Sequence, residues 1–294
     1  MACPGDLHIY NIVQGQTKIY EKSFQIITGN NMKNKYDIVY SIGHDCACSM
    51  YLRKHNLRVV SGPLDWLTSV PAHNRFDLLL NDFEGFMNQD DFQFVEKNPN
   101  IVNDDKCDYY KNTRTGLYFY HDFPVNVPLD QSFPDVEKKY KRRIDRFYQN
   151  IKKHKRVLLV WFSHYHRTSD EQWIWFLQKF CQKMGKNIDL LVVQHTENQY
   201  QPIRRQIADN IVVWELHTVE KDTQGNNTTI GNEKLCSTIF SQYRLNVPRD
   251  KHLKYIWKIC VLNTFCKFMP HRNFRHNWRR KIKSELNKMI VERR

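Results

Sequence analysis

Residues 36–48 read YDIVYSIGHDCAC, an apolar run that stops at a glycine and is followed by His44, Asp45 and Cys46. The run is rich in β-branched and aromatic residues, which predicts a strand over 36–42. The glycine predicts a turn, and a helix that begins at about residue 46 completes a strand, a turn and a helix. The free N–H groups and the dipole at such a helix start stabilise a thiolate. The stretch therefore predicts a Cys46 thiol of lowered pKa.

Four further segments have the composition of strands. They are GLYFYH at 116–121, RVLLVWFS at 156–163, IDLLVVQ at 188–194 and NIVVWELH at 210–217. Several are apolar at every position, which is typical of parallel strands covered on both faces. Longer amphipathic stretches alternate with the strands, so the sequence predicts an α/β fold with a largely parallel sheet flanked by helices.

Three helices are predicted from the spacing of apolar residues. In 169–184 the expected N-cap is Ser169, acids occupy the first turn, and Gly185 is the expected end. In 136–153 apolar residues recur every three or four positions and leave a basic outer face. The run at 75–87 is a shorter helical candidate.

The chain is expected to divide into three regions. Residues 1–30 are an N-terminal extension, 31–249 a single α/β domain, and 250–294 a helical C-terminal region that ends in a basic amphipathic tail. Within the domain, 88–115 and 218–233 are polar and rich in turn residues, which favours surface loops or lids. With 41% hydrophobic residues, the chain of 294 residues can fill a sizeable core.

Charge and cysteine content limit the partners and the compartment. The chain has 45 Lys and Arg against 31 Asp and Glu, so its expected partners are anions: nucleic acid, anionic lipid or phosphorylated substrates. The eight cysteines form neither CxxC pairs nor a regular framework, which favours reduced thiols in the cytoplasm. The N-terminus lacks a signal pattern, and no apolar run approaches the ~20 residues that a membrane span requires.

The tail at 271–294 carries nine Lys or Arg against two Glu, a net charge of +7. An apolar stripe runs along it at helical spacing, through Trp278, Ile282, Leu286, Met289 and Ile290. Two interpretations stay open. The stripe packs on the domain, or the tail lies on an anionic membrane surface at the inner face of the membrane.

Histidines gather at the carboxyl ends of the predicted strands, where an open parallel sheet binds its ligands. Each of the five strands ends at or beside one: His44, His121, His164, His195 and His217. His164 and His166 could share a metal only with a third ligand, which the neighbouring sequence does not supply. Neither a dinucleotide fingerprint nor a GxxxxGK[ST] loop is present, so no metal and no cofactor is expected.

A reactive Cys46 needs a base that accepts its proton. His121 is the preferred base and His44 its competitor. Asp122 or Asp65 could orient the base, and Asp65 is sterically freer, because adjacent strand residues point to opposite faces. The alternative for the cysteine is the ordinary role of a free thiol, a small buried apolar side chain.

The stretch 41–66 resembles the signature of a bacterial family of uncharacterised domains described as papain-like cysteine peptidases. The matching positions are Ser41, Ile42, Gly43, Cys46, the Leu-Arg pairs at 52–53 and 57–58, and Pro63, Asp65 and Trp66, with leucine at 64 where the family has phenylalanine. The His-Asp-Phe triplet at 121–123 and the Tyr-x-Arg-Arg-Ile helix at 140–144 are also similar. The resemblance covers roughly residues 36–220.

This resemblance implies Cys46 as the nucleophile and His121 as the general base, with Asp122 or Asp65 as the orienting group. It also implies a papain-like α+β fold, in which the cysteine helix packs against an antiparallel barrel, as the alternative to the parallel sheet. For 156–217 the periodicity favours parallel strands with a crossover helix.

Three functions follow as hypotheses. The first is a cysteine hydrolase, peptidase or acyl transferase acting on a peptide, acyl or glycan substrate. Its expected substrate-binding residues are His44, Arg53, Trp66, His164 and Arg167. The second is a surface-polysaccharide assembly enzyme, such as a sugar transferase, because the basic tail is similar to segments of bacterial enzymes that build lipopolysaccharide or capsule. The third is a non-catalytic binding protein, with nucleic acid disfavoured because no RNA-binding aromatic motif is present.

Overall fold

The computed structural model describes residues 34–97, 107–165, 167–246, 249–268, 274–275, 277–279 and 281–282. The extension predicted at 1–30 and most of the tail at 271–294 lie outside these residues. By its internal contacts the chain forms two compact units, Met1–Asn34 and Lys35–Arg294. The candidate site lies within the second unit.

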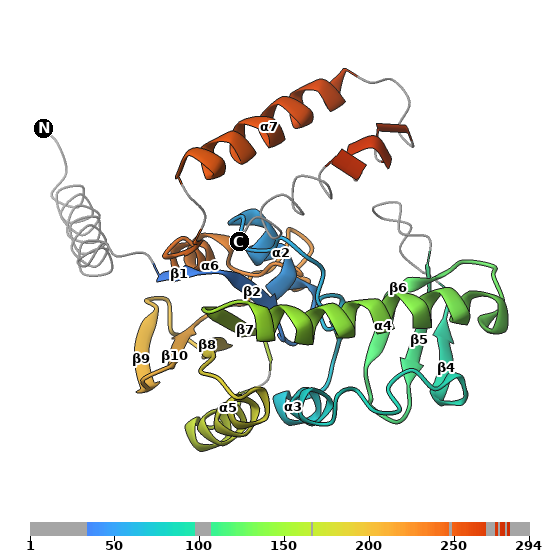
Figure 1. Ribbon diagram of the computed structural model, residues 1–294, viewed down its shortest axis with the longest axis horizontal. Helices are drawn as coiled ribbons and strands as arrows, with labels where there is room; N and C mark the ends of the chain where they lie inside the picture. The colour runs from blue at the N-terminus through green and yellow to red at the C-terminus, as the bar shows by residue number, and fades with distance from the viewer. Residues whose placement is uncertain are drawn as a thin grey trace, which may run out of the picture. The chain divides into compact units, whose positions relative to one another are not determined.

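A five-stranded sheet stands at the centre of the second unit, with the strand order β2-β7-β8-β10-β9 (Figure 1). The bounds are β2 (Ile38–Ser41), β7 (Val157–Ser163), β8 (Asp189–His195), β10 (Ile211–Leu216) and β9 (Ile203–Ala208). The first four strands pair in parallel, and β9 is antiparallel to β10 at the edge. The strands predicted at 156–163, 188–194 and 210–217 are confirmed to within one residue at each end.

A second, four-stranded sheet is wholly antiparallel, with the order β3-β6-β5-β4. Its strands are β3 (Leu67–Thr68), β6 (Tyr118–Pro124), β5 (Cys107–Asn112) and β4 (Phe92–Glu96). A third, two-stranded sheet pairs β1 (Asn34–Tyr36) with β11 (Tyr243–Leu245).

These sheets correct the fold prediction. The class is α/β, but its sheets are mixed, and the strand predicted at 116–121 belongs to the antiparallel sheet. The prediction of a surface loop at 88–115 is wrong where β4 and β5 lie. β4 is exposed at all positions but its first, and β5 alternates partly exposed with buried residues, so both strands carry polar residues and resemble a loop in composition.

The helix predicted at 169–184 is confirmed as α5 (Asp170–Met184), which Ser169 caps and Gly185 ends in the left-handed conformation. The other helices are α2 (Cys46–Lys54), α3 (Ala72–Leu80), α4 (Leu129–Lys153), α6 (Glu233–Phe240) and α7 (Arg249–Lys267), with a 3-10 turn, η1 (Gln89–Asp91). α4 begins well before the predicted residue 136 and continues through Pro134, which reads as a helix breaker in the sequence. None of the helices in the described part of the chain combines the length and apolarity that crossing a bilayer demands.

The core has two parts, one on each face of the central sheet. α3, α4 and α5 cover one face together with the inner side of the antiparallel sheet, and α2 and α6 cover the other. Alternate residues of β7 divide between them: Trp161 packs in the first part, and Val160 and Phe162 pack in the second. Burial on both faces explains why β7 is apolar at almost every position.

Candidate active site

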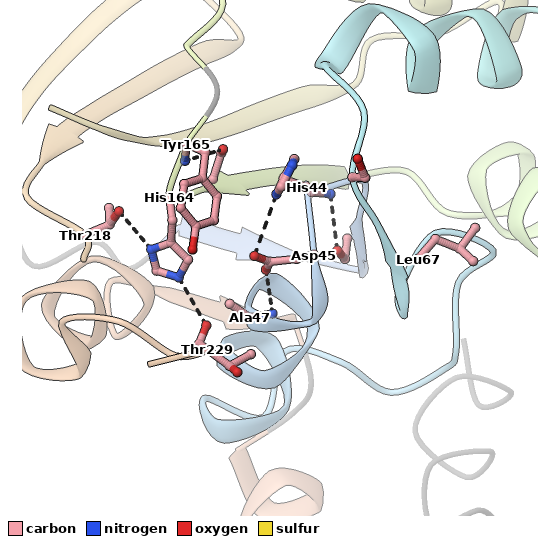
Figure 2. Close-up of polar contacts among 12 residues, drawn as sticks. His44, Asp45, Ala47, Leu67, His164, Tyr165, Thr218 and Thr229 are labelled. Atoms are coloured by element: carbon pink, nitrogen blue, oxygen red, sulfur yellow. Dashed lines mark hydrogen bonds and ion pairs between the residues drawn. The ribbon is translucent and has the colours of Figure 1, made fainter. Parts of the chain in front are cut away.

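The α2 helix begins at Cys46, as the sequence predicted. Asp45 is its N-cap, and one carboxylate oxygen accepts a hydrogen bond of 2.8 Å from the N–H of Ala47 (Figure 2). Just before the cap, a Cβ on Gly43 would lie 2.8 Å from the Cβ of Cys48 and 2.9 Å from the backbone nitrogen of Phe162. The glycine is therefore needed for α2 to lie close against β7.

The Cys46 thiol lies next to His121. Its Sγ atom is 3.6 Å from Nε2 of the imidazole, within hydrogen-bond distance for sulfur. Cys46 follows a strand of the central sheet, whereas His121 belongs to β6 of the antiparallel sheet. The two residues meet where the sheets adjoin, and proton transfer between them needs no rearrangement.

A bulge in β6, where its pairing with β5 shifts register, places the side chains of His121 and Asp122 in different surroundings. Asp108 pairs with Phe123 and Tyr110 with Phe119, so one residue of β5 stands opposite three residues of β6, including His121. Bulges of this kind re-aim side chains and are common beside active sites. His121 is exposed, whereas Asp122 is buried.

The two carboxylates proposed to orient His121 have other partners. The Asp122 carboxylate accepts hydrogen bonds from Lys139 at 2.5 Å and from the Tyr140 hydroxyl at 2.9 Å, both on α4. The Asp65 carboxylate binds Arg58 at 2.6 Å and the N–H of Gly62 at 2.9 Å. These contacts give no support to either residue as the direct partner of His121.

Trp66 forms a wall of the site. Its ring packs edge-on against His121, with centroids 5.9 Å apart, and the Arg58 guanidinium lies 5.2 Å from the Trp66 ring centroid. Arg58 is held in turn by Asp65. Arg58 and Trp66 thus connect Asp65 to His121.

The fully buried Arg75 was not recognised from the sequence. Its Nη2 donates to the carbonyl oxygens of His44 at 2.6 Å, Leu67 at 2.7 Å and Ser69 at 3.2 Å. Burial lowers the pKa of Arg75 to about 10, against the opposing charge of Asp45. The sequence signal was a lone arginine inside an apolar helix, which by itself resembles an ordinary surface position.

The expected lowering of the Cys46 pKa is wrong. Burial of the largely enclosed side chain, followed by the negative charge of Asp45, raises the pKa of the Cys46 thiol to about 12. The Thr68 hydroxyl and the charge of Arg75 act in the opposite direction and are outweighed. The cap that organises the helix start also places a carboxylate beside the sulfur, so the resting thiol is neutral at pH 7.

His44, the competing base, is buried instead of facing solvent. Its ring packs edge-on against Trp161 and Tyr165, with centroids 6.4 and 5.9 Å apart, and its Nδ1 lies 3.7 Å from the Asp45 carboxylate (Figure 2). The thiol of Cys46 contacts the imidazole of His121. The geometry therefore favours His121 over His44 as the base.

Two of the predicted substrate-binding residues are engaged in internal contacts. His164 is buried, with Nδ1 2.9 Å from the Thr218 hydroxyl and Nε2 3.1 Å from the Thr229 carbonyl (Figure 2). Arg167 binds the Glu215 carboxylate at 2.7 Å. Arg53 is exposed on α2, and His166 lies outside the described residues.

Comparison with known proteins gives a family and one distant relative. Residues 37–198, more than half of the chain, match the sequence model of a family described as "Putative papain-like cysteine peptidase (DUF1796)". The chain is also similar to a protein of Acanthamoeba polyphaga mimivirus whose name says that it is uncharacterised, with 27% identity over 131 residues. That match covers 41% of this chain and 59% of the relative. No solved structure matches. Because the relative is viral, the comparisons do not support the bacterial origin that the resemblance suggested.

Replacing Asp45 by asparagine should make Cys46 more reactive. Asparagine also caps helices, so the start of α2 is kept while the charge beside the sulfur is removed and the thiol pKa falls. Iodoacetamide attacks the thiolate, so at pH 8 the variant should alkylate several-fold faster at Cys46, as followed by peptide mass spectrometry. The exposed Cys260 is the internal control and should react equally in both proteins. An unchanged rate at Cys46 would show that Asp45 does not control the thiol.

Replacing Asp122 by asparagine should weaken the fold and leave the chemistry of Cys46 intact. The amide loses the ion pair with Lys139 and part of the bond to Tyr140, which should lower the free energy of unfolding by about 1–3 kcal/mol. Urea denaturation measures this loss, with the exposed Asp135→Asn on the same helix as the matched control. If acylation of Cys46 slows by a hundredfold at unchanged stability, then Asp122 orients His121 after all.

Proposed function

The chain belongs to the family described as "Putative papain-like cysteine peptidase (DUF1796)", and we propose that it is a cysteine-dependent acyl hydrolase or acyl transferase with Cys46 as nucleophile and His121 as general base. The observation that carries this proposal is the 3.6 Å contact between Sγ and Nε2. A nucleophile within hydrogen-bond reach of an imidazole is the minimum arrangement for nucleophilic catalysis by cysteine. The family match agrees with this chemistry.

In the first step the Cys46 thiol gives its proton to Nε2 of His121 as the sulfur attacks the carbonyl carbon of the substrate. The raised thiol pKa means that the proton leaves during attack, so the pair works by general-base catalysis and not from a stored thiolate. A new S–C bond forms and the carbonyl electrons move to oxygen. The backbone N–H of Cys46, at the start of α2, is the donor best placed to stabilise that oxyanion.

In the second step the tetrahedral adduct collapses to an acyl-enzyme. The C–N or C–O bond to the leaving group breaks, and imidazolium at His121 returns its proton to that group. His121 then takes a proton from water, or from an acceptor amine or alcohol, as that molecule attacks the thioester carbonyl. The S–C bond breaks, and His121 returns the proton to the departing Cys46 sulfur. Hydrolysis and acyl transfer differ only in the identity of this acceptor.

The walls of the site favour a substrate with an apolar or aromatic group beside the scissile carbonyl. Trp66 packs against His121. Burial first, then the neighbouring tyrosines and Glu96, and last the charge of a Cys46 thiolate raise the pKa of the Tyr120 hydroxyl to about 12, which places Tyr120 near the sulfur. Tyr109 and Tyr118 extend this aromatic surface, with ring centroids 4.5 and 5.7 Å from that of Tyr120. The comparisons lend no support to the surface-polysaccharide alternative.

An activated ester tests this proposal without knowledge of the natural substrate. With p-nitrophenyl acetate, the protein should show a burst of nitrophenol, and intact and peptide mass spectrometry should find the acetyl group on Cys46. Cys46→Ala should abolish the burst, and His121→Ala should slow acylation by about 10²–10⁴-fold because the general base is lost. Cys260→Ala, which removes an exposed thiol on α7, is the matched control and should behave as the unaltered protein. Acetylation of Cys46 at an equal rate in His121→Ala would contradict the assigned base.

A further inference from the structure

A second group of reactive side chains lies at the carboxyl end of the central sheet. His195 ends β8, His217 follows β10, and Glu197 stands in the turn after β8. The two parallel strands are neighbours, with Leu216 paired to His195. One ligand atom from each of the three residues lies within 4.8 Å of the others. This edge of a parallel sheet is where ligands bind in open α/β folds.

The backbone holds the two chain segments together. The N–H of Thr196 donates to the carbonyl of Leu216 at 2.9 Å, and the N–H of His217 donates to the carbonyl of Gln199 at 2.6 Å. The ring of Tyr200 also packs against His217, with centroids 4.8 Å apart. The side chains of the group are thus brought together by the fold itself, before any ligand is considered.

Two buried nitrogen atoms in this group make no hydrogen bond within the described residues: Nε2 of His195 and Nδ1 of His217. They face the two oxygens of Glu197, at 3.2 and 3.8 Å. Buried polar atoms without a hydrogen bond are rare, and a cation between two imidazoles and a carboxylate would satisfy all three. The Glu197 side chain is 77% exposed and connects the group to solvent.

A chain of hydrogen bonds behind His195 can hold the tautomer that a metal requires. The Thr229 carbonyl only accepts, so Nε2 of His164 carries a proton, and burial lowers the pKa of His164 and keeps its Nδ1 free to accept. The Thr218 hydroxyl can then donate to His164 at 2.9 Å and accept from Nδ1 of His195 at 3.2 Å. With the proton on Nδ1, Nε2 of His195 presents its lone pair to Glu197 and to a cation.

The backbone N–H of Thr218 opposes this tautomer. It donates to the same Nδ1 of His195 at 3.1 Å, which without a cation favours the proton on Nε2, beside Glu197. Binding of a cation through Nε2 therefore requires the proton of His195 to move to Nδ1, which then donates a hydrogen bond to the Thr218 hydroxyl. The affinity of the site consequently depends on that hydroxyl.

We propose that His195, Glu197 and His217 form a binding site for a divalent transition-metal cation of the Zn²⁺ class, with Thr218 as a positioning residue. Two imidazole nitrogens and one carboxylate are the ligands that Zn²⁺ accepts in three-residue sites, which leave a further position for water. Metal–ligand bonds of about 2.0–2.2 Å require the three atoms to draw closer together, and the exposed Glu197 has the freedom to do so.

Calorimetric titration of the full chain with Zn²⁺ tests the site, in a Cys46→Ala background so that the Cys46–His121 pair does not contribute. Zinc bound by the other cysteines is common to all variants. The readout is therefore the difference in the number of zinc equivalents bound between the background protein and each variant. The background protein should bind one equivalent more than His217→Ala or Glu197→Gln. His73→Ala, which removes an exposed imidazole on α3, is the matched control and should keep that equivalent.

The role of Thr218 is tested in the same titration. Thr218→Val should lower the affinity for the additional zinc ion by about 10-fold or more. Thr218→Ser, which keeps the hydroxyl, should restore that affinity. Equal numbers of equivalents and equal affinities in the background protein, His217→Ala and Glu197→Gln would overturn the metal site. Equal affinities in the valine and serine variants would overturn the part assigned to Thr218.

Discussion

The candidate site depends on one buried cation, the guanidinium of Arg75. It binds the carbonyl of His44 in the turn after β2 and the carbonyl of Leu67 in β3. β3 pairs with β6, the strand that carries His121, so this arginine ties the start of the cysteine helix to the sheet that carries the proposed base. A buried charge is costly unless it is hydrogen-bonded, and here backbone carbonyls accept hydrogen bonds from the two terminal nitrogens of the guanidinium. Loss of Arg75 would leave those carbonyls unpaired and the two sheets without this link.

The same region sets the reactivity of the thiol through opposing effects. The dipole at the start of α2 and the charge of Arg75 favour a thiolate, whereas burial and the Asp45 carboxylate favour the neutral thiol. The neutral form prevails, so in the proposed mechanism His121 takes the proton of Cys46 while the substrate is bound. A neutral thiol is also less readily oxidised than a thiolate.

Much of the central sheet and the position of Cys46 could be predicted from the sequence. Strands such as 156–163 are apolar throughout because both faces are buried, and Ser169 and Gly185 mark the ends of their helix by capping chemistry that is local. Cys46 was placed at a helix start because the apolar strand and the glycine turn lie directly before it in the sequence.

The remaining features depend on contacts between distant residues. The bulge in β6 turns Asp122 toward α4, and it arises from pairing with β5, a strand that was taken for part of a loop. The raised pKa of Cys46 follows from burial and from the direction of the Asp45 side chain, neither of which a motif specifies. Arg75 gains its role only where the turn after β2 and β3 come together around it.

The central claim is that Cys46 and His121 form one reacting pair across two sheets. A 1,3-dihaloacetone tests it most directly, because this short reagent alkylates a thiol first and then a nucleophile within a few ångströms of it. With Sγ and Nε2 3.6 Å apart, peptide mass spectrometry should find Cys46 and His121 joined by the three-carbon bridge. His121→Ala should yield only the single adduct at Cys46. A single adduct in the unaltered protein, or a bridge from Cys46 to another residue, would contradict the account.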